Sequence, residues 1–94
     1  MLIIAGHIRV GAEERDGYVA ECEEVVRAAR AADGCLDFSI TADTLEPDRI
    51  DIFERWESEA ELMAFRGSGP SSDQQAQIVA AEVKRYEISG VTDP

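Results

Sequence analysis

Hydrophobic and polar residues alternate along four stretches of the chain, as they do in β-strands with two different faces. These stretches cover residues 2–10, 35–42, 50–56 and about 82–91. Between Ala12 and Ala32, hydrophobic positions instead recur every three or four residues, which indicates an amphipathic helix. The pattern therefore predicts a strand, a long helix, two strands, a shorter helical region and a last strand.

Local signals indicate where these elements begin and end. An Asp-Gly pair at 33–34 ends the first helix, since glycine readily adopts the left-handed conformation of a helix C-cap. The sequence Ser-Glu-Ala-Glu at 58–61 is a capping box, which predicts a short helix that runs to about Arg66. A further short helix is predicted over 73–81. The glycine- and serine-rich stretch at 67–72 is interpreted as a connector, with a lid as the alternative.

This order of elements is typical of a ferredoxin-like α+β sandwich, in which helices cover one side of a four-stranded antiparallel sheet. We expect one domain over residues 1–94, with 90–94 as a tail. Because apolar surface is unstable in water, we expect two copies to pair through the uncovered face as a homodimer that encloses a barrel. The apolar residues predicted on that face are Ile3, Ala5, Ile50, Ile52 and Trp56.

Acidic residues outnumber basic residues by 20 to 9, which gives a formal net charge of −11. Such a charge repels the phosphates of nucleic acids and anionic lipids, so we expect neither nucleic acid nor membrane as a partner. No stretch approaches the roughly 18 apolar residues of a membrane span, and the first residues lack a secretion pattern. We therefore expect a cytoplasmic protein. Cys22 and Cys35 lack metal-site spacing and are expected to be free thiols.

Three segments of the chain are similar to one known family. They are Ile-Ala-Gly-His-Ile-Arg-Val-Gly at 4–11, Asp-Gly-Cys-Leu-Asp-Phe at 33–38 and Ile-Phe-Glu-Arg-Trp-Glu-Ser at 52–58. Together with the helices between them, they resemble the antibiotic biosynthesis monooxygenase domain, a branch of the dimeric α+β barrel superfamily. The resemblance covers nearly the whole chain, and the segment around Trp56 is its most specific part.

The resemblance implies a cofactor-independent monooxygenase that oxidises a small electron-rich aromatic, such as an anthrone or a quinol, with dioxygen. Removing a proton from such a substrate makes an anion that can itself pass an electron to dioxygen. The protein then has to supply a base or hydrogen-bond partner and an apolar slot that excludes water. No metal or flavin is needed.

Two alternatives to this function remain open. The same fold is compatible with a non-catalytic small-molecule-binding or accessory protein. A haem-degrading monooxygenase is a minor alternative, because residues 72–81 contain no histidine that could ligate haem iron.

Trp56 and His7, the only tryptophan and the only histidine, are the candidate catalytic residues. The indole is suited to stack on a planar ligand and to donate a hydrogen bond to a ring oxygen. His7, expected on the same sheet face, is suited to act as a base near neutral pH. Each also has a structural interpretation, in the core or at the dimer interface. The predicted substrate-binding residues are Arg9, Ile52, Glu54, Phe65 and Arg85, with ion pairing as the alternative role of the arginines.

Overall fold

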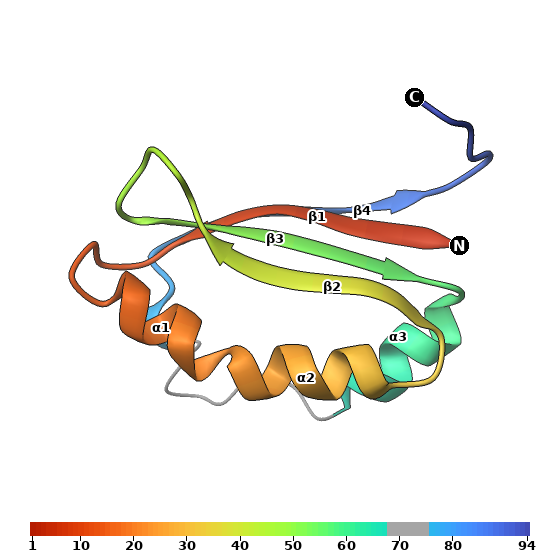
Figure 1. The fold of residues 1–94 in the computed structure, drawn as a ribbon, viewed down its shortest axis with the longest axis horizontal. Helices are drawn as coiled ribbons and strands as arrows, with labels where there is room; N and C mark the ends of the chain where they lie inside the picture. Colours follow the sequence, from red (N-terminus) through yellow and green to blue (C-terminus); the bar gives the residue numbers. More distant parts are fainter. Residues whose placement is uncertain (68–75) are drawn as a thin grey trace.

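The structure is a computed structural model that describes residues 1–67 and 76–94. Its elements in chain order are β1 (Leu2–Arg9), α1 (Arg15–Glu21), α2 (Glu23–Ala31), β2 (Cys35–Ala42), β3 (Arg49–Trp56), α3 (Glu59–Arg66) and β4 (Ala80–Glu87). The strands form one antiparallel sheet in the order β2-β3-β1-β4, and the helices lie on one side of it (Figure 1). The predicted ferredoxin-like α+β fold is confirmed. Within the described residues, none of the helices has the length and apolar character needed to cross a bilayer.

The long helix predicted over 12–32 is divided into α1 and α2. The division lies at Cys22, whose N–H is shared between the carbonyl oxygens of Tyr18 and Val19, at 3.1 Å each. Cys22 keeps a helical backbone conformation, with φ −74° and ψ −9°, so α2 continues closely from α1 (Figure 1). The amphipathic pattern therefore located the helical region correctly but gave no sign of this local tightening.

The predicted N-cap of α3 at Ser58 is confirmed, but Glu61 contacts the Ser58 hydroxyl instead of a backbone N–H as a capping box requires. The Glu61 N–H donates to Ser58 Oγ at 3.4 Å, and the Ser58 hydroxyl donates to Glu61 Oε1 at 2.9 Å. An N-cap satisfies backbone N–H groups that the first helical turn leaves without partners. The cap therefore sets the point at which the chain leaves β3 and turns back across the sheet as α3.

The last strand begins earlier than the sequence pattern indicates. β4 starts at Ala80, whereas the pattern placed a helix over 73–81 and the strand over 82–91. The helix prediction was therefore wrong at its C-terminal end. Apart from its first residue, the stretch at 67–72 lies outside the described residues.

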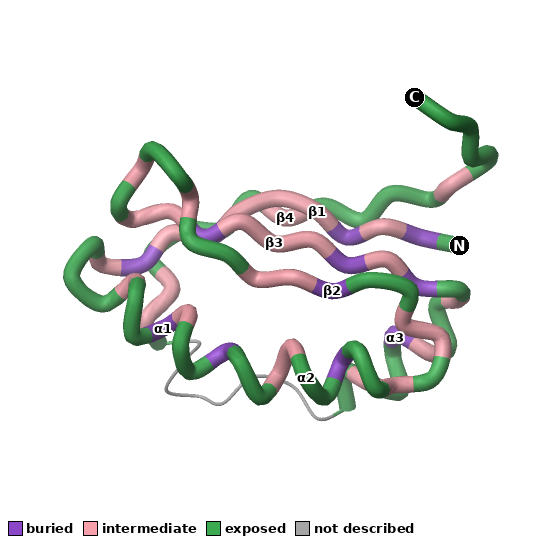
Figure 2. Tube along the Cα trace, viewed as in Figure 1, coloured by how far each residue is buried: buried purple, intermediate pink, exposed green. Residues whose placement is uncertain are grey.

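The core lies between the sheet and the helices, and strand register decides which side chains enter it. Leu2 of β1 is paired with Trp56 of β3, and Ile8 with Ile50. Residues directly opposite each other in an antiparallel pair point to the same face. All four are buried, and buried positions recur along the strands in Figure 2.

Trp56, Ile50 and Ile52 are therefore on the helical side of the sheet, and the prediction that placed them on the uncovered face was wrong. Ile3 and Ala5 do lie on the uncovered face, where the register places them opposite Arg55 and Phe53. Both strands carry apolar residues at odd and at even positions, so the sequence pattern by itself did not distinguish the two faces.

Glycine at position 6 allows β1 and β4 to approach closely. Gly6 has a φ of 153°, and a Cβ added there would collide with the carbonyl oxygen of Glu82 on β4. Side-chain-bearing residues rarely adopt such a φ. The close approach predicted from the glycine in this strand is confirmed.

Candidate functional site

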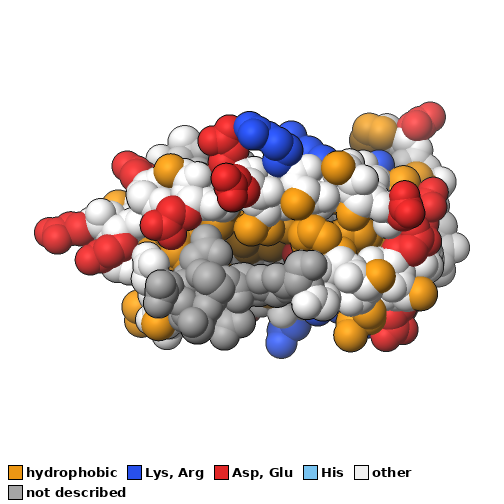
Figure 3. Space-filling model, turned by 90° about the horizontal axis from the view of Figure 1, so that it is seen from below, with side chains coloured by type: hydrophobic (Ala, Val, Ile, Leu, Met, Phe, Trp, Pro, Cys, Tyr) orange, Lys and Arg blue, Asp and Glu red, His pale blue; other side chains and the backbone are white. Residues whose placement is uncertain are grey.

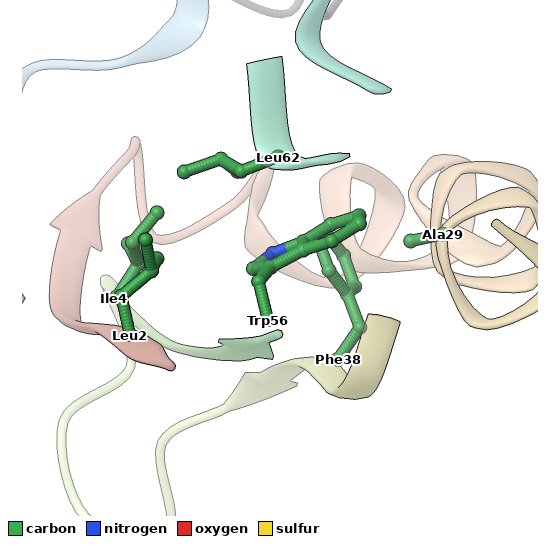
Figure 4. Close-up of a cluster of buried hydrophobic side chains, with 6 residues drawn as sticks. All are labelled: Leu2, Ile4, Ala29, Phe38, Trp56 and Leu62. Carbon is green, nitrogen blue, oxygen red and sulfur yellow. The ribbon is translucent and has the colours of Figure 1, made fainter. Parts of the chain in front are cut away.

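Trp56 lies at the centre of an aromatic and aliphatic cluster between the sheet and the helices. Its exposed fraction is 0%. The indole lies among Leu62 of α3, Phe38 of β2 and Ala29 of α2 (Figure 4). The Phe65 ring, also on α3, has its centroid 5.4 Å from that of the indole and 5.8 Å from that of Phe38. The short connection from β3 into α3 thus folds the helix back over the tryptophan that precedes it.

The indole N–H donates a hydrogen bond to a carboxyl group inside this apolar region. Trp56 Nε1 donates to Glu54 Oε1 at 3.0 Å. The two residues are two positions apart on β3 and therefore share a face. Among the described residues, Glu54 is the only charged side chain that is buried, with an exposed fraction of 9%.

Burial raises the pKa of the Glu54 carboxyl above its ordinary value, because an apolar environment disfavours the ionised form. The hydrogen bond from Trp56 and the positive charge of Arg66 oppose this shift without cancelling it. The result is a carboxyl group that binds a proton more strongly than an exposed glutamate does. Carboxyl groups with a raised pKa are found at catalytic sites, which makes Glu54 a candidate functional residue.

Cys35 of β2 lies near this carboxyl group. Burial raises the pKa of the Cys35 thiol, and the negative charge of Glu54 raises it further. The thiol also donates a weak hydrogen bond to the Asp37 carbonyl oxygen, at 3.6 Å. A thiol with a raised pKa is a poor nucleophile, so Cys35 adds little reactivity to the site.

Arg85 projects from β4 on the helical side, because it pairs with the buried Ile4. Its Nη2 lies 3.1 Å from Glu59 Oε2 at the start of α3 and 2.9 Å from Glu87 Oε1. These acids raise the pKa of Arg85, mainly through the hydrogen bond to Glu59. The arginine therefore ties β4 to α3, in line with the alternative of ion pairing.

His7 and Arg9 lie on the opposite, uncovered face of the sheet. His7 Nε2 lies 3.9 Å from Glu82 Oε2, and Arg9 is paired with Asp48 at 2.9 Å and Glu46 at 3.3 Å. The prediction that His7 and Trp56 share a face was wrong, because the sheet separates them within one chain. The structure instead groups Ile52, Glu54, Trp56, Phe65 and Arg85 on the helical side.

The helical side is also where the surface is hollowed. Figure 3 shows hydrophobic side chains gathered along the middle of this side, within a depression. Between the helices and β2, a groove of about 450 Å³ is lined by Val19, Glu23, Val26, Arg27, Arg30 and Ile40. Apart from the helical pattern that placed Val26 on the buried side, sequence reasoning gave no sign of this groove.

Comparison with known proteins places these observations in a family. The sequence model described as antibiotic biosynthesis monooxygenase matches residues 1–81. The chain belongs to the antibiotic biosynthesis monooxygenase family. The resemblance noted in the sequence is therefore confirmed over most of the chain.

Solved structures of this family share the fold. A candidate antibiotic biosynthesis monooxygenase from Deinococcus radiodurans superposes with a TM-score of 0.85 at 18% identity, over 100% of this chain and 98% of that one. Another from Chloroflexus aurantiacus J-10-fl is 25% identical, with a TM-score of 0.73, over 97% and 96% of the two chains. At such identities the likeness indicates a common architecture and does not identify a substrate.

One curated relative also matches in sequence. It is an uncharacterized protein of Synechocystis, 26% identical over 61 residues. The match covers 65% of this chain but only 42% of that protein. The chain thus spans less than half of the curated relative's length, and the relative's name assigns no activity.

Proposed function

We propose that this protein is a monooxygenase that oxidises an electron-rich aromatic compound of the anthrone or quinol type with dioxygen. The proposed site is on the helical side of the sheet, around Glu54 and Trp56. Membership of the monooxygenase family supports the reaction class. The observation that carries the proposal is a proton-binding carboxyl group held by an indole N–H within an otherwise apolar cluster.

The proposed reaction needs no electron donor other than the substrate. When an anthrone is oxidised, its ring CH₂ becomes a carbonyl and loses four electrons. One oxygen atom of dioxygen enters the product, and the other leaves as water with the two hydrogens of the CH₂. A quinol that is oxidised to a hydroxyquinone also loses four electrons, takes up one oxygen atom of dioxygen and releases the other as water. The apolar surroundings would shield the anionic and radical intermediates from water.

The geometry changes the role proposed for Trp56. An indole with no exposed surface cannot stack on a ligand unless Phe65 or Leu62 is displaced. Trp56 instead holds the Glu54 carboxyl group through its N–H. Ile52 and Phe65 supply apolar walls, and Arg85 stands at the edge of the site in its ion pair with α3. His7 and Arg9 have no place in the site of their own chain, since they lie on the far face.

Oxygen uptake tests this proposal directly. Purified protein is incubated with anthrone or naphthohydroquinone, and dioxygen consumption is compared with autoxidation in buffer. We expect wild-type protein to accelerate uptake and Trp56→Phe to slow it at least tenfold, because phenylalanine lacks the N–H that orients the carboxyl group. His7→Ala is the matched control and is expected to retain the wild-type rate. If none of the proteins exceeds autoxidation with either probe, the proposal is wrong.

A non-catalytic binding protein is the second candidate. The groove of about 450 Å³ between the helices and β2 favours it, because the residues that line this groove do not include Glu54 or Trp56. In that case, the probes would quench Trp56 fluorescence with saturation while dioxygen consumption stayed at the autoxidation rate.

We further propose that the uncovered face of the sheet pairs with a second copy of the chain. Ile3, Ala5, Phe53 and Tyr86 lie on this face, and Tyr86 is 53% exposed. Arg55 Nε is buried there and has no hydrogen-bond partner among the described residues. A buried donor without a partner is costly. A facing copy would cover the apolar residues and bring acceptors to this arginine.

Charge on the uncovered face supports the same pairing. Asp51 and Glu82 are the strand partners of His7 on this face, and Lys84 is the partner of Ala5. A two-fold axis brings a face against itself, so a face that carries both signs can match acids of one copy with bases of the other.

A further inference from the structure

Glu54 is a buried carboxyl group in an apolar part of the sheet. It projects from β3 toward the helices, and its cross-strand neighbours are Ile4 and Phe38, which are both buried. An apolar side chain would pack in this position without the free-energy cost of burying a carboxylate. The chain instead places a carboxyl group there and orients it with the Trp56 N–H.

We infer that the Glu54 carboxylate is the base that removes a proton from the aromatic substrate, and that Trp56 is the residue that positions it. This inference rests on the proposed oxidation and assigns the base which that reaction requires. In this step, an O–H or activated C–H bond of the substrate breaks, and its electron pair stays on the substrate. The proton bonds to a carboxylate oxygen of Glu54. The negative charge thus moves from the glutamate to the substrate, whose anion then passes an electron to dioxygen.

The charged and titratable groups around Glu54 are compatible with its role as a base. Arg66 of α3 favours the ionised carboxylate, and Cys35 of β2 lies near it as a protonated thiol. Arg30 of α2 donates to the Phe38 carbonyl oxygen at 2.8 Å, and Arg85 of β4 is paired with acids. Burial raises the pKa of Glu54 and so makes its carboxylate a stronger base than an exposed one. Because the ionised form is the active one, the rate is expected to rise with pH through this raised pKa.

Other candidate bases are less well placed. His7 projects from the opposite face, where its Nε2 lies 3.9 Å from Glu82 Oε2. Asp51, paired with His7 in the register, is on that face too. Glu61 is engaged by the Ser58 hydroxyl at the start of α3. Among the described residues, Glu54 is the carboxyl group that lies within the apolar cluster itself.

The test separates proton transfer from oxidation by removing dioxygen. Under anaerobic conditions, anthrone is added to wild-type protein, and the coloured anthrone anion is followed by absorbance. We expect wild type to bind anthrone as the anion and Glu54→Gln to bind it as the neutral molecule. The amide oxygen of glutamine can still accept the Trp56 hydrogen bond, so the variant removes the basic group while keeping the contact. His7→Gln is the matched control and should form the anion as wild type does.

Aerobic kinetics provide the second readout. We expect Glu54→Gln to lower kcat by about 10²- to 10⁴-fold, the usual contribution of a general base, and to abolish the rise of rate with pH. Glu54→Asp retains a carboxylate at a shorter reach, so it should keep the pH dependence with a smaller loss. It also serves as the test variant if circular dichroism shows that Glu54→Gln is unfolded.

The outcomes distinguish this inference from the proposed function. If wild type forms the anion anaerobically and Glu54→Gln does not, but wild type consumes no dioxygen, the assignment of Glu54 as the base is supported and the oxidation proposal is wrong. If wild type consumes dioxygen and Glu54→Gln retains both the anion and the rate, the assignment of Glu54 is overturned. A folded Glu54→Asp protein that has lost the rise of rate with pH overturns it as well. If wild type neither forms the anion nor consumes dioxygen, both are overturned.

Discussion

Glu54 and Trp56 are two residues apart on β3, and the indole N–H of one donates a 3.0 Å hydrogen bond to the carboxyl group of the other. Trp56 lies between the sheet and the helices in a cluster with apolar side chains from β1, β2, α2 and α3 (Figure 4). Glu54 is paired across the sheet with two members of this cluster, Ile4 and Phe38. The hydrogen bond between the two side chains lowers the free-energy cost of burying them in an apolar cluster. Burying the carboxyl group still costs free energy. That cost should be measurable in the stability of the protein as well as in its proposed chemistry.

The first prediction concerns the pH dependence of stability. The pKa of Glu54 is raised in the folded protein above its ordinary value of 4.5, so the folded state holds this proton to higher pH than the unfolded state does. The contribution of Glu54 to the free energy of unfolding should therefore fall as pH rises from about 4.5 to the raised pKa. Glu54→Gln removes this contribution. Urea denaturation across this range should show a stability difference, variant minus wild type, that grows with pH. A constant difference would contradict the prediction.

The second prediction concerns the packing of α3 over the indole. Leu62→Ala should lower the free energy of unfolding by about 2–5 kcal/mol, because it leaves a cavity beside Trp56. Met63→Ala, one residue further along the same helix, should change it by less than about 1 kcal/mol, because Met63 is 54% exposed. Chemical denaturation monitored by Trp56 fluorescence measures both variants. Equal losses would mean that α3 does not pack as described.

The third prediction compares the same substitution at two glycines. Gly6→Ala should destabilise the protein by about 1–3 kcal/mol, because its Cβ would meet the Glu82 carbonyl oxygen and its φ is positive. Gly17→Ala in α1 should stabilise it by about 0.5–1 kcal/mol, because a Cβ there meets nothing within 4 Å and alanine favours helix. Thermal unfolding of the two variants should therefore shift in opposite directions. A stable Gly6→Ala protein would contradict the close approach of β1 to β4.

The fourth prediction concerns the uncovered face. Wild-type protein should sediment as a dimer, and Phe53→Glu should sediment as a monomer, because it places a charge among the apolar residues of the proposed interface. Leu45→Glu is the matched control, since Leu45 is 89% exposed in the β2–β3 connection and is not on the sheet. A wild-type monomer at micromolar concentration would overturn the pairing proposal. So would a Phe53→Glu protein that remains dimeric.

Much of the local structure could be predicted because it depends on neighbours in the chain. The Ser58 cap, the end of the first helix near Gly34 and the order of helices and strands along the chain follow from short-range signals, and the structure contains each of them. The period of two along β3 also predicted that Glu54 and Trp56 share a face. The start of β4 at Ala80 was missed, because the alanine and valine residues before it fit a helix as well as a strand.

The location of the site could not be predicted in the same way. Strand alternation divides residues into two sets, but it does not say which set the helices cover. In β1, His7 belongs to one set, and Leu2 and Ile4 belong to the other. In β3, Phe53 and Trp56 likewise belong to different sets. The prediction placed His7 and Trp56 on the same face of the sheet. In the structure His7 is paired with Asp51 and Trp56 with Leu2, so the two residues point to opposite faces.

The sequence by itself therefore determined the elements, their order and the pairs of residues that share a face within each strand, because these depend on backbone geometry and nearby side chains. Only the tertiary structure decided that Trp56 and Glu54 enter the core while His7 stays on the open side. That choice depends on how α2 and α3 pack on the sheet, because Trp56 is buried together with Ala29 of α2 and Leu62 of α3, and this contact between elements distant in the chain removes their apolar surface from water.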